Sequence, residues 1–252
     1  MKNLFLFLFL LVVFTSKAQD NRVSGLNSRQ FTKYWKVESE SPDYKVTFQG
    51  DTAEIVSPKG LTLWRKEKMS GKVTIEYDAC VVVESDGDRL SDLNCFWMAS
   101  DPQYPDNLWK REKWRSGIFL NCYSLQLYYL GYGGNHNSTT RFRRYDGDES
   151  GITNPKARPA ILKEYTDAGH LLKPNHWYHI KITNENNRVS YYIDGERLVD
   201  FRDAEPLREG WFGFRTTLSR TRITNFSYEC SCKRRLLFLC NGLVRLPVRI
   251  RP

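Results

Sequence analysis

The sequence has little of what catalytic, metal-binding and membrane proteins most often depend on. It contains only four His among 252 residues, and none of its six Cys stands in a C-x-x-C pair, which argues against a zinc site. His176 and His179 would point to opposite faces of a strand, so we predict no metal site there. No glycine-rich loop precedes a helical segment, which excludes a phosphate-binding loop. No apolar run approaches the ~20 residues of a membrane-spanning helix, so we predict no transmembrane segment.

Acidic residues are missing from both ends of the chain. Residues 1–18 contain two basic residues and residues 230–252 contain six, and without these eight the formal net charge falls from +9 to +1. A protein that binds the phosphate backbone needs its positive charge on the folded surface. The charge distribution therefore argues against nucleic acid as a partner.

The first eighteen residues are typical of an export signal. Lys2 precedes an unbroken apolar run over residues 4–14, and Ser16 and Ala18 supply the small residues of a cleavage site. We therefore predict a signal peptide over 1–18, a single domain over 19–229 and a basic C-terminal tail outside the fold over 230–252. The mature protein is expected in the periplasm or outside the cell.

Apolar residues recur with a period of two along most of the domain. Residues 72–83 place Val, Ile, Tyr and Ala on one face and mostly polar side chains on the other, and residues 178–182 and 189–193 alternate similarly. Asp194-Gly195 is typical of a hairpin turn. No segment gives a convincing long amphipathic helix. The sequence therefore predicts an all-β sandwich of two antiparallel sheets.

Several motifs resemble a known fold family. The C-terminal half of concanavalin A-like lectin/glucanase jelly rolls resembles this chain at residues 177–180, 192–195, 210–215 and 223–226. Residues 87–99 and 133–145 are similar to an uncharacterised exported bacterial family of that fold, to which the YesU protein is distantly similar. The resemblance implies a jelly roll and an association with pectin and rhamnogalacturonan breakdown, but it implies no agreed reaction.

The most unusual segment is residues 131–148, which is rich in Gly, Arg and aromatic residues. Arg141, Arg143 and Tyr145 share one face if the segment is extended. Guanidinium groups pair with carboxylates in two parallel hydrogen bonds, so an acidic saccharide is a suitable partner. Asn135 and His136 nearby supply an amide and an imidazole.

This segment suggests catalytic chemistry at a uronic acid. We predict that Arg143 neutralises the carboxylate while His136 or Tyr145 removes the α-proton, with Arg141 and Asn135 binding substrate. The alternative is a solvated strand whose arginines pair with the acidic residues at 146, 148 and 149.

Other candidate binding residues are mostly aromatic. The predicted sugar platforms are Trp97, Trp109 and Trp114, and the alternative is that these rings pin a long loop over 101–116 to the sandwich. Two residues on one face of the next strand, Gln126 and Tyr128, are expected to form the floor of the same cleft. We also expect Arg89 to line it.

Two acidic groups suggest further alternatives. Residues 86–92 resemble a calcium loop, but Leu90 and Ser91 replace residues that an EF-hand requires. We therefore predict no cofactor, with a structural calcium as the alternative to an Asp-stabilised turn. Glu76 and Asp78 on one strand face suggest a glycoside hydrolase.

The leading hypothesis is an exported carbohydrate-active protein that binds and processes an acidic polysaccharide or oligosaccharide, favouring a polysaccharide lyase. A non-catalytic carbohydrate-binding module or lectin is the alternative from another class. A hydrolase through Glu76 and Asp78 is the third.

Overall fold

The computed structural model describes residues 23–231. The predicted signal peptide and all but the first two residues of the predicted tail lie outside the described residues. Strands make up most of the regular structure: β1 (Val23–Ser24), β2 (Trp35–Ser39), β3 (Lys45–Gln49), β4 (Thr52–Arg65), β5 (Met69–Ser70), β6 (Val73–Val81), β7 (Leu93–Ser100), β8 (Gln126–Gly133), β9 (Thr139–Asp146), β10 (Lys163–Tyr165), β11 (Tyr178–Glu185), β12 (Arg188–Ile193), β13 (Glu196–Arg202) and β14 (Glu209–Cys230).

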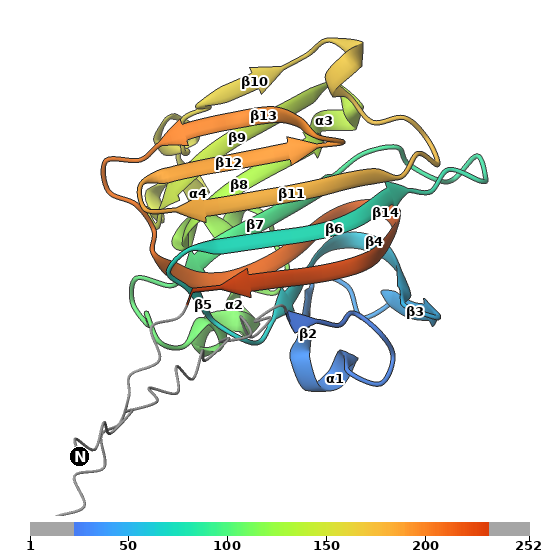
Figure 1. Ribbon diagram of the computed structural model, residues 1–252, viewed down its shortest axis with the longest axis horizontal. Helices are drawn as coiled ribbons and strands as arrows, with labels where there is room; N and C mark the ends of the chain where they lie inside the picture. The colour runs from blue at the N-terminus through green and yellow to red at the C-terminus, as the bar shows by residue number, and fades with distance from the viewer. Residues whose placement is uncertain (1–22, 232–252) are drawn as a thin grey trace, which may run out of the picture.

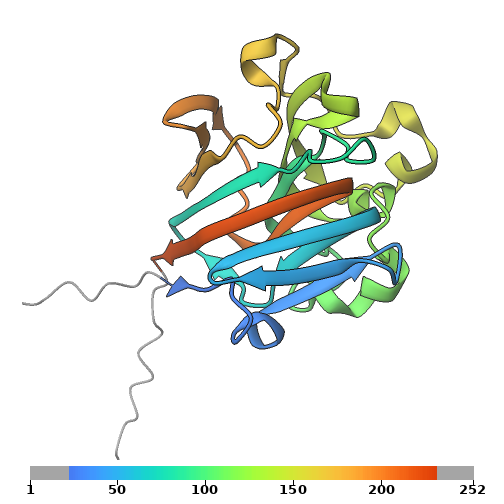
Figure 2. The same ribbon diagram turned by 90° about the vertical axis from the view of Figure 1, so that its right-hand side faces the viewer.

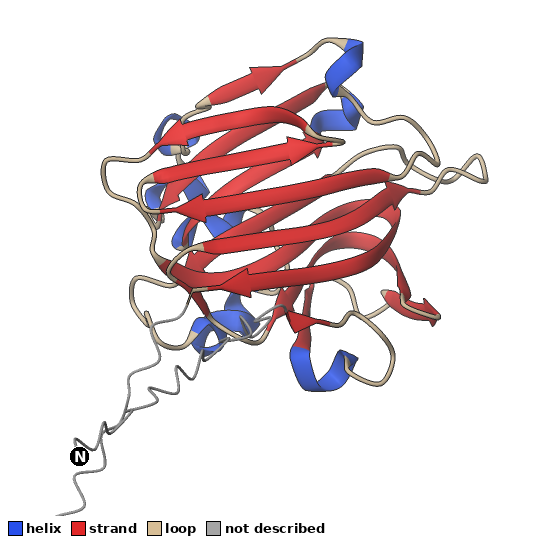
Figure 3. Cartoon of the chain, viewed as in Figure 1, coloured by secondary structure: helices blue, strands red, loops and turns tan. Residues whose placement is uncertain are grey.

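The helices are all short and lie at the ends and edges of the strands (Figure 3). They are α1 (Phe31–Tyr34), α2 (Glu112–Arg115), α3 (Gly134–Asn137) and α4 (Ser150–Thr153), with 3-10 helices η1 (Leu108–Arg111), η2 (Leu120–Ser124), η3 (Pro155–Ala157) and η4 (Ala168–His170). Within residues 23–231, none of them has the length and apolar character needed to cross a bilayer.

The strands form two antiparallel layers that share β14 and β4 (Figures 1 and 2). The first sheet contains β10, β9, β8, β7, the first half of β14, the second half of β4, and β2. The second sheet contains β13, β12, β11, β6, the second half of β14, the first half of β4, and β3. The prediction of a jelly-roll sandwich is confirmed.

β14 passes from one sheet to the other at a bulge. Its 22 residues pair with β7 around Phe214 and with β6 around Ile223. Between these regions the register shifts at Leu218, whose φ is +52° and whose side chain is 52% exposed. A bulge bends a strand and increases its twist, which allows one strand to serve both layers.

The main core lies between the two sheets and is built from alternate residues. On β6, the predicted apolar face is buried, with Val73, Ile75, Tyr77, Ala79 and Val81 each no more than 3% exposed. This face meets residues of the first sheet that also alternate along their strands: Tyr128, Leu130 and Tyr132 on β8 and Phe142 on β9. Period-two patterning therefore gives the correct buried face for β6.

A second core lies on the outer face of the first sheet. Residues 101–125, here called the covering segment, pack Leu108, Cys122 and Leu125 against that face. The segment is also held by a buried ion pair, since Arg115 Nη2 lies 2.9 Å from Glu38 Oε2 on β2. The covering segment therefore leaves only part of the outer face open.

Candidate functional site

Side chains on the outer face of the first sheet form rows that cross its strands in register. Arg141 on β9 is paired with Gly131 on β8, Gly131 with Asn94 on β7, and Asn94 with Arg215 on β14. Adjacent strands lie about 4.8 Å apart, so the Arg141 and Asn94 backbones are about 10 Å apart. This first row carries polar groups at both sides of a glycine.

The second row carries two aromatic rings beside an arginine. Arg143 is paired with Tyr129, Tyr129 with Phe96, and Phe96 with Gly213. One step further along β9, Tyr145 lies beneath the covering segment. Only the first row and part of the second therefore face the open side.

Part of the two rows, namely Arg141, Gly131 and Asn94 of the first and Arg143 and Tyr129 of the second, forms the floor of a groove of about 340 Å³. Its polar lining consists of Arg89, Asp92, Asn94, Asn135, Thr139, Arg141, Arg143 and Thr217. Its aromatic lining consists of Phe119 and Tyr123 from the covering segment and Tyr129 from β8. In Figure 1, the strands β7, β8 and β9 that carry it lie behind the second sheet.

Tyr129 lies along the floor because residue 131 has no side chain. A Cβ at Gly131 would lie 2.3 Å from the Tyr129 hydroxyl oxygen and 2.8 Å from its Cζ. The hydroxyl therefore reaches the first row, between the backbones of Arg141 and Asn94. Burial raises the pKa of Tyr129, and the nearby Asp92 carboxylate adds to this, so the phenol stays protonated.

The arginines of the groove are only partly neutralised by the protein. Arg141 Nε donates to Glu164 Oε1 at 2.5 Å, and Arg143 donates to the carbonyl oxygen of Pro159. Within residues 23–231, Arg143 has no carboxylate partner. Among the residues that the structure describes, three guanidinium groups line the groove with a single carboxylate, that of Asp92.

Asp92 organises the end of the groove nearest β7. Its carboxylate lies 3.0 Å from Arg89 Nη1 and accepts a hydrogen bond from Asn94 Nδ2 at 3.2 Å. Arg89 Nη1 also donates to the carbonyl oxygen of Thr217 on β14 at 3.0 Å. The other end of the Asn94 amide, Oδ1, is buried without a hydrogen-bond partner among the described residues.

A left-handed turn forms one rim of the groove. Asn135, His136 and Asn137 have φ values of +53°, +59° and +56°, a left-handed conformation in which Asn and His occur more often than most L-residues. Asn137 holds the turn, because its Nδ2 donates to the carbonyl oxygen of Leu172 at 2.9 Å and its Oδ1 accepts from Leu172 N at 2.8 Å. Asn135 lines the groove, whereas His136 is exposed and does not.

The structure brings together four of the predicted site residues, namely Arg89, Asn135, Arg141 and Arg143. It corrects the assignment of Tyr145 as a catalytic base. Tyr145 is 0% exposed and packs against Tyr123 and Tyr129. Burial raises its pKa well above the usual value, so it stays neutral and out of contact with substrate.

Trp97 and Tyr128 also face the wrong way for their predicted roles. Both are 0% exposed and point into the core between the sheets. The Tyr128 hydroxyl donates to Asp203 Oδ2 at 2.6 Å, which fixes it in that position. Gln126, on the same strand, is half-buried and lies outside the groove lining.

The two tryptophans of the covering segment lie outside the groove lining. Trp109 packs edge-on against Trp211, with ring centroids 6.1 Å apart. Trp114 is 45% exposed, and the Arg111 guanidinium lies 5.1 Å from its ring centre. Trp109 thus fits the alternative of pinning the loop.

The acidic residues suggested for other functions lie elsewhere. Glu76 and Asp78 are on the outer face of β6, where Glu76 pairs with Lys181 at 3.1 Å and Asp78 with His179 at 2.7 Å. Among residues 23–231 no cluster of three or more His, Cys, Asp and Glu is arranged to hold a metal. In the 86–92 loop, Asp88 accepts hydrogen bonds from two backbone amides, as in the Asp-stabilised turn.

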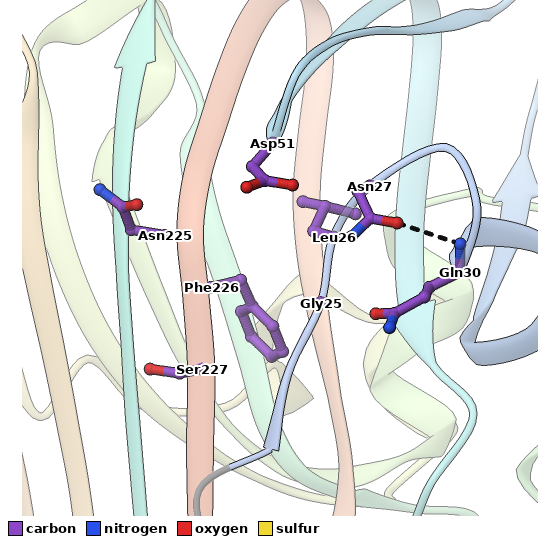
Figure 4. Close-up of a pocket in the computed structure, with 8 residues that line it drawn as sticks. All are labelled: Gly25, Leu26, Asn27, Gln30, Asp51, Asn225, Phe226 and Ser227. Atoms are coloured by element: carbon purple, nitrogen blue, oxygen red, sulfur yellow. Dashed lines mark hydrogen bonds between the residues drawn. The ribbon is translucent and has the colours of Figure 1, made fainter.

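A second cavity, of about 390 Å³, lies near the start of the described chain (Figure 4). Its polar side chains include Asn27, Gln30 and Asp51, and Gln30 N donates to Asn27 Oδ1 at 3.1 Å. Asn225 points away from these residues in Figure 4, and its Nδ2 donates to Asp78 Oδ2 at 2.6 Å. No cationic side chain from residues 23–231 lines this cavity, so it lacks the charge of the groove.

Sequence reasoning missed several groove residues. Asn94 and Tyr129 carry no motif of their own, and Phe119 and Tyr123 come from a segment whose tryptophans are the more prominent candidates. The position of Tyr129 could have indicated it as a groove residue, because it lies two residues before Gly131 and therefore on the same face of the strand.

Comparisons with known proteins agree with this architecture. Residues 55–226 match the family described as "Domain of unknown function (DUF6250)". No curated protein matches the sequence significantly. A Bacillus subtilis protein of unknown function with a galectin-like fold is 16% identical, with a TM-score of 0.62 over 78% of this chain and 89% of that chain.

Two carbohydrate-binding structures are also similar. The carbohydrate-binding module CBM66 from Bacillus subtilis is 15% identical, with a TM-score of 0.51 over 77% of this chain and 94% of that chain. The exoplasmic domain of VIP36, in a form bound to Ca²⁺ and Man3GlcNAc, is 8% identical, with a TM-score of 0.53 over 83% and 88%. At these identities the likeness shows the fold alone, a galectin-like and concanavalin A-like jelly roll.

Proposed function

Since the chain belongs to the DUF6250 family, whose description assigns no activity, we propose from its groove that it is a carbohydrate-binding protein for acidic saccharides. The printed names of CBM66 and of the saccharide-bound VIP36 domain support a saccharide as the ligand class for this fold. The groove volume of about 340 Å³ lies within the ~300–1,000 Å³ that is usual for small-molecule sites.

The observation that carries the proposal is the lining of the groove. Three guanidinium groups face one carboxylate, and tyrosine and phenylalanine rings stand beside them. Aromatic rings contact sugar faces while guanidinium forks bind carboxylates, so the combination suits a uronic acid better than a neutral sugar.

The same residues carry the resemblance to the exported family. Arg89, Asp92 and Asn94 fall within residues 87–99, and Asn135, Arg141 and Arg143 within residues 133–145. Pectin and rhamnogalacturonan fragments contain uronic acids, and they are the ligands that we propose. With the apolar run of residues 4–14, this supports a place of action in the periplasm or outside the cell.

We propose binding rather than β-elimination. Elimination requires a base within hydrogen-bonding reach of the α-proton. Of the two bases expected, Tyr145 is buried in the second core, and His136 lies outside the groove lining. A non-catalytic carbohydrate-binding protein therefore fits the groove better than a lyase.

The test is a titration of the full protein with polygalacturonate and with its fully methyl-esterified form. We expect binding to the acid, at least ~10-fold weaker binding to the ester, and a similar loss in Arg143→Ala, since a charge-assisted hydrogen bond contributes about 1.5–3 kcal/mol. Arg188→Ala is the matched control, because Arg188 pairs with Asp200 on the second sheet.

Two results would contradict the proposal. Equal affinity for the acid and the ester would remove the role of the arginines. Growing absorbance from an unsaturated uronate product would show that the protein is a lyase instead.

A further inference from the structure

The groove contains a hydroxyl group that forms no hydrogen bond with the described part of the chain. The Tyr129 hydroxyl lies over Gly131 in the first row, because a Cβ added to Gly131 would be only 2.3 Å from the hydroxyl oxygen. It makes no hydrogen bond within residues 23–231, although Tyr129 itself is only 8% exposed. The Tyr145 hydroxyl is fully buried and also lacks a hydrogen-bond partner, whereas the Tyr129 hydroxyl is not fully buried. The free hydroxyl of Tyr129 is therefore open to the groove.

A second polar atom beside it also lacks a partner. Asn94 is 6% exposed, and its Oδ1 has no hydrogen-bond partner among the described residues. Its Nδ2 donates to Asp92 Oδ1, so the amide cannot turn round without bringing two oxygens together. The Oδ1 atom is itself buried, so the bond to Asp92 fixes Asn94 as part of the groove floor and leaves the Tyr129 hydroxyl as the unpaired polar atom that the groove exposes.

These groups stand at a defined separation from the arginines. Asn94, Gly131 and Arg141 are paired in register, which places the Tyr129 hydroxyl about 5 Å from the backbones on either side. Arg141 and Arg143 lie on one side of it and Asn94 on the other. One sugar residue can therefore reach both sides, with its carboxylate on the arginines and a ring hydroxyl over Tyr129.

We propose that Tyr129 is a specificity-determining residue whose hydroxyl recognises a free ring hydroxyl on the same uronate whose carboxylate binds Arg141 and Arg143. This inference rests on the proposed function. It adds that the groove selects uronates with an unmodified hydroxyl and rejects those that carry an O-acetyl group there. Acetylation removes the donor and adds bulk, and a site built to bond a hydroxyl discriminates strongly against its loss.

The test compares oligogalacturonate with the same oligomer O-acetylated on its ring hydroxyls, by calorimetric titration of the full protein. We expect the acetylated oligomer to bind at least about tenfold more weakly than the free one. In Tyr129→Phe the free oligomer should lose about tenfold in affinity, and the difference between the two oligomers should shrink. The melting temperature should not fall, because the hydroxyl has no partner among residues 23–231.

The matched control is Tyr145→Phe. Both tyrosines belong to the same aromatic cluster and neither hydroxyl has a partner in the described part of the chain, but of the two only Tyr129 lines the groove. Tyr145→Phe should bind both oligomers as the wild type does.

The outcomes separate the two proposals. If Tyr129→Phe binds both oligomers like the wild type while Arg143→Ala fails to bind, the hydroxyl inference is wrong and the acidic-saccharide function stands. If the wild type binds no uronate oligomer at all, both are wrong.

Discussion

A single glycine determines the shape of the groove floor. Gly131 leaves the space that the Tyr129 ring and hydroxyl occupy, and its backbone conformation is open to other residues. The requirement is therefore for the absence of a side chain, not for an unusual φ.

Gly131→Ala should both destabilise the protein and weaken saccharide binding. The new methyl group would have to displace a ring that is 8% exposed, and overpacking of this kind costs about 1–3 kcal/mol. Urea denaturation and a uronate titration measure the two effects. Gly87→Ala is the control, because a Cβ there meets no atom within 4 Å. Wild-type stability and affinity in Gly131→Ala would show that the ring moves freely.

Two buried tyrosine hydroxyls should respond in opposite directions to the same substitution. The Tyr145 hydroxyl has no partner among the described residues, so Tyr145→Phe should leave stability unchanged or raise it by up to about 1 kcal/mol. The Tyr128 hydroxyl donates to Asp203 and accepts from Leu207 N, so Tyr128→Phe should cost about 1–3 kcal/mol. Thermal unfolding of the pair checks this, and a large loss in Tyr145→Phe would imply an unseen partner.

At the scale of the strand, the sequence predicts the two-residue period of the side chains but not always which face of the strand is buried. The β6 face follows from alternation because its other side carries Thr74, Glu76 and Asp78. On β8, residues 127–133 are all buried, because one side meets the main core and the other meets the covering segment. When both faces of a strand are covered, apolar and polar residues no longer alternate along it. The sequence pattern therefore places Tyr128 on the outer, groove-facing side of β8, which Tyr129 occupies in the structure.

The same limit explains which parts of the site could be foreseen. Arg141 and Arg143 alternate with the buried Phe142, so their shared outward face follows from the sequence. Tyr145 continues the same alternation, yet it is buried because the covering segment lies over it. Where residues 101–125 pack depends on contacts distant in sequence, such as that between Arg115 and Glu38, which local pattern does not reveal.

The bulge in β14 carries backbone strain that a substitution can relieve. Leu218 has φ +52° and an exposed side chain, so its cost of about 1–2 kcal/mol has little packing to offset it. Leu218→Gly should raise the free energy of unfolding by about 0.5–1 kcal/mol after the entropy cost of glycine. Leu218→Ala removes the same exposed surface but keeps the Cβ, and it should give no gain in urea denaturation. Equal gains in both variants would rule out strain as the cause.

At the scale of the molecule, a histidine joins the free edges of the two sheets. His170 stacks on Tyr165 of β10, with ring centres 4.1 Å apart, and its Nε2 lies 3.2 Å from Glu196 on β13. Burial alone lowers the pKa of His170, but hydrogen bonds to Asp167 and Glu196 outweigh this and raise it. Protonated His170 therefore stabilises the contact between β10 and β13, the edge strands of the two sheets.

This edge should make stability dependent on pH. A pKa raised on folding contributes stability that is complete below the ordinary value of about 6.5 and is lost as pH rises through the folded value. The melting temperature of His170→Gln should therefore fall below that of the wild type at low pH and approach it at higher pH. His136→Asn, at the exposed left-handed turn, should follow the wild type throughout. A constant difference between His170→Gln and wild type across this range would refute the link.

The position of β14 in the chain sets the order in which the domain can fold. β6 and β7 follow each other in sequence, but they do not pair with each other. Each pairs on one side with β14, which begins only at Glu209. A chain emerging from a ribosome or a translocation channel thus has neither sheet complete until almost all of the domain has appeared. Contacts this distant form late and leave strand edges unpaired in the meantime. We expect the nascent chain to remain accessible to chaperones and proteases until its last strand is inserted, and then to close both layers in one step.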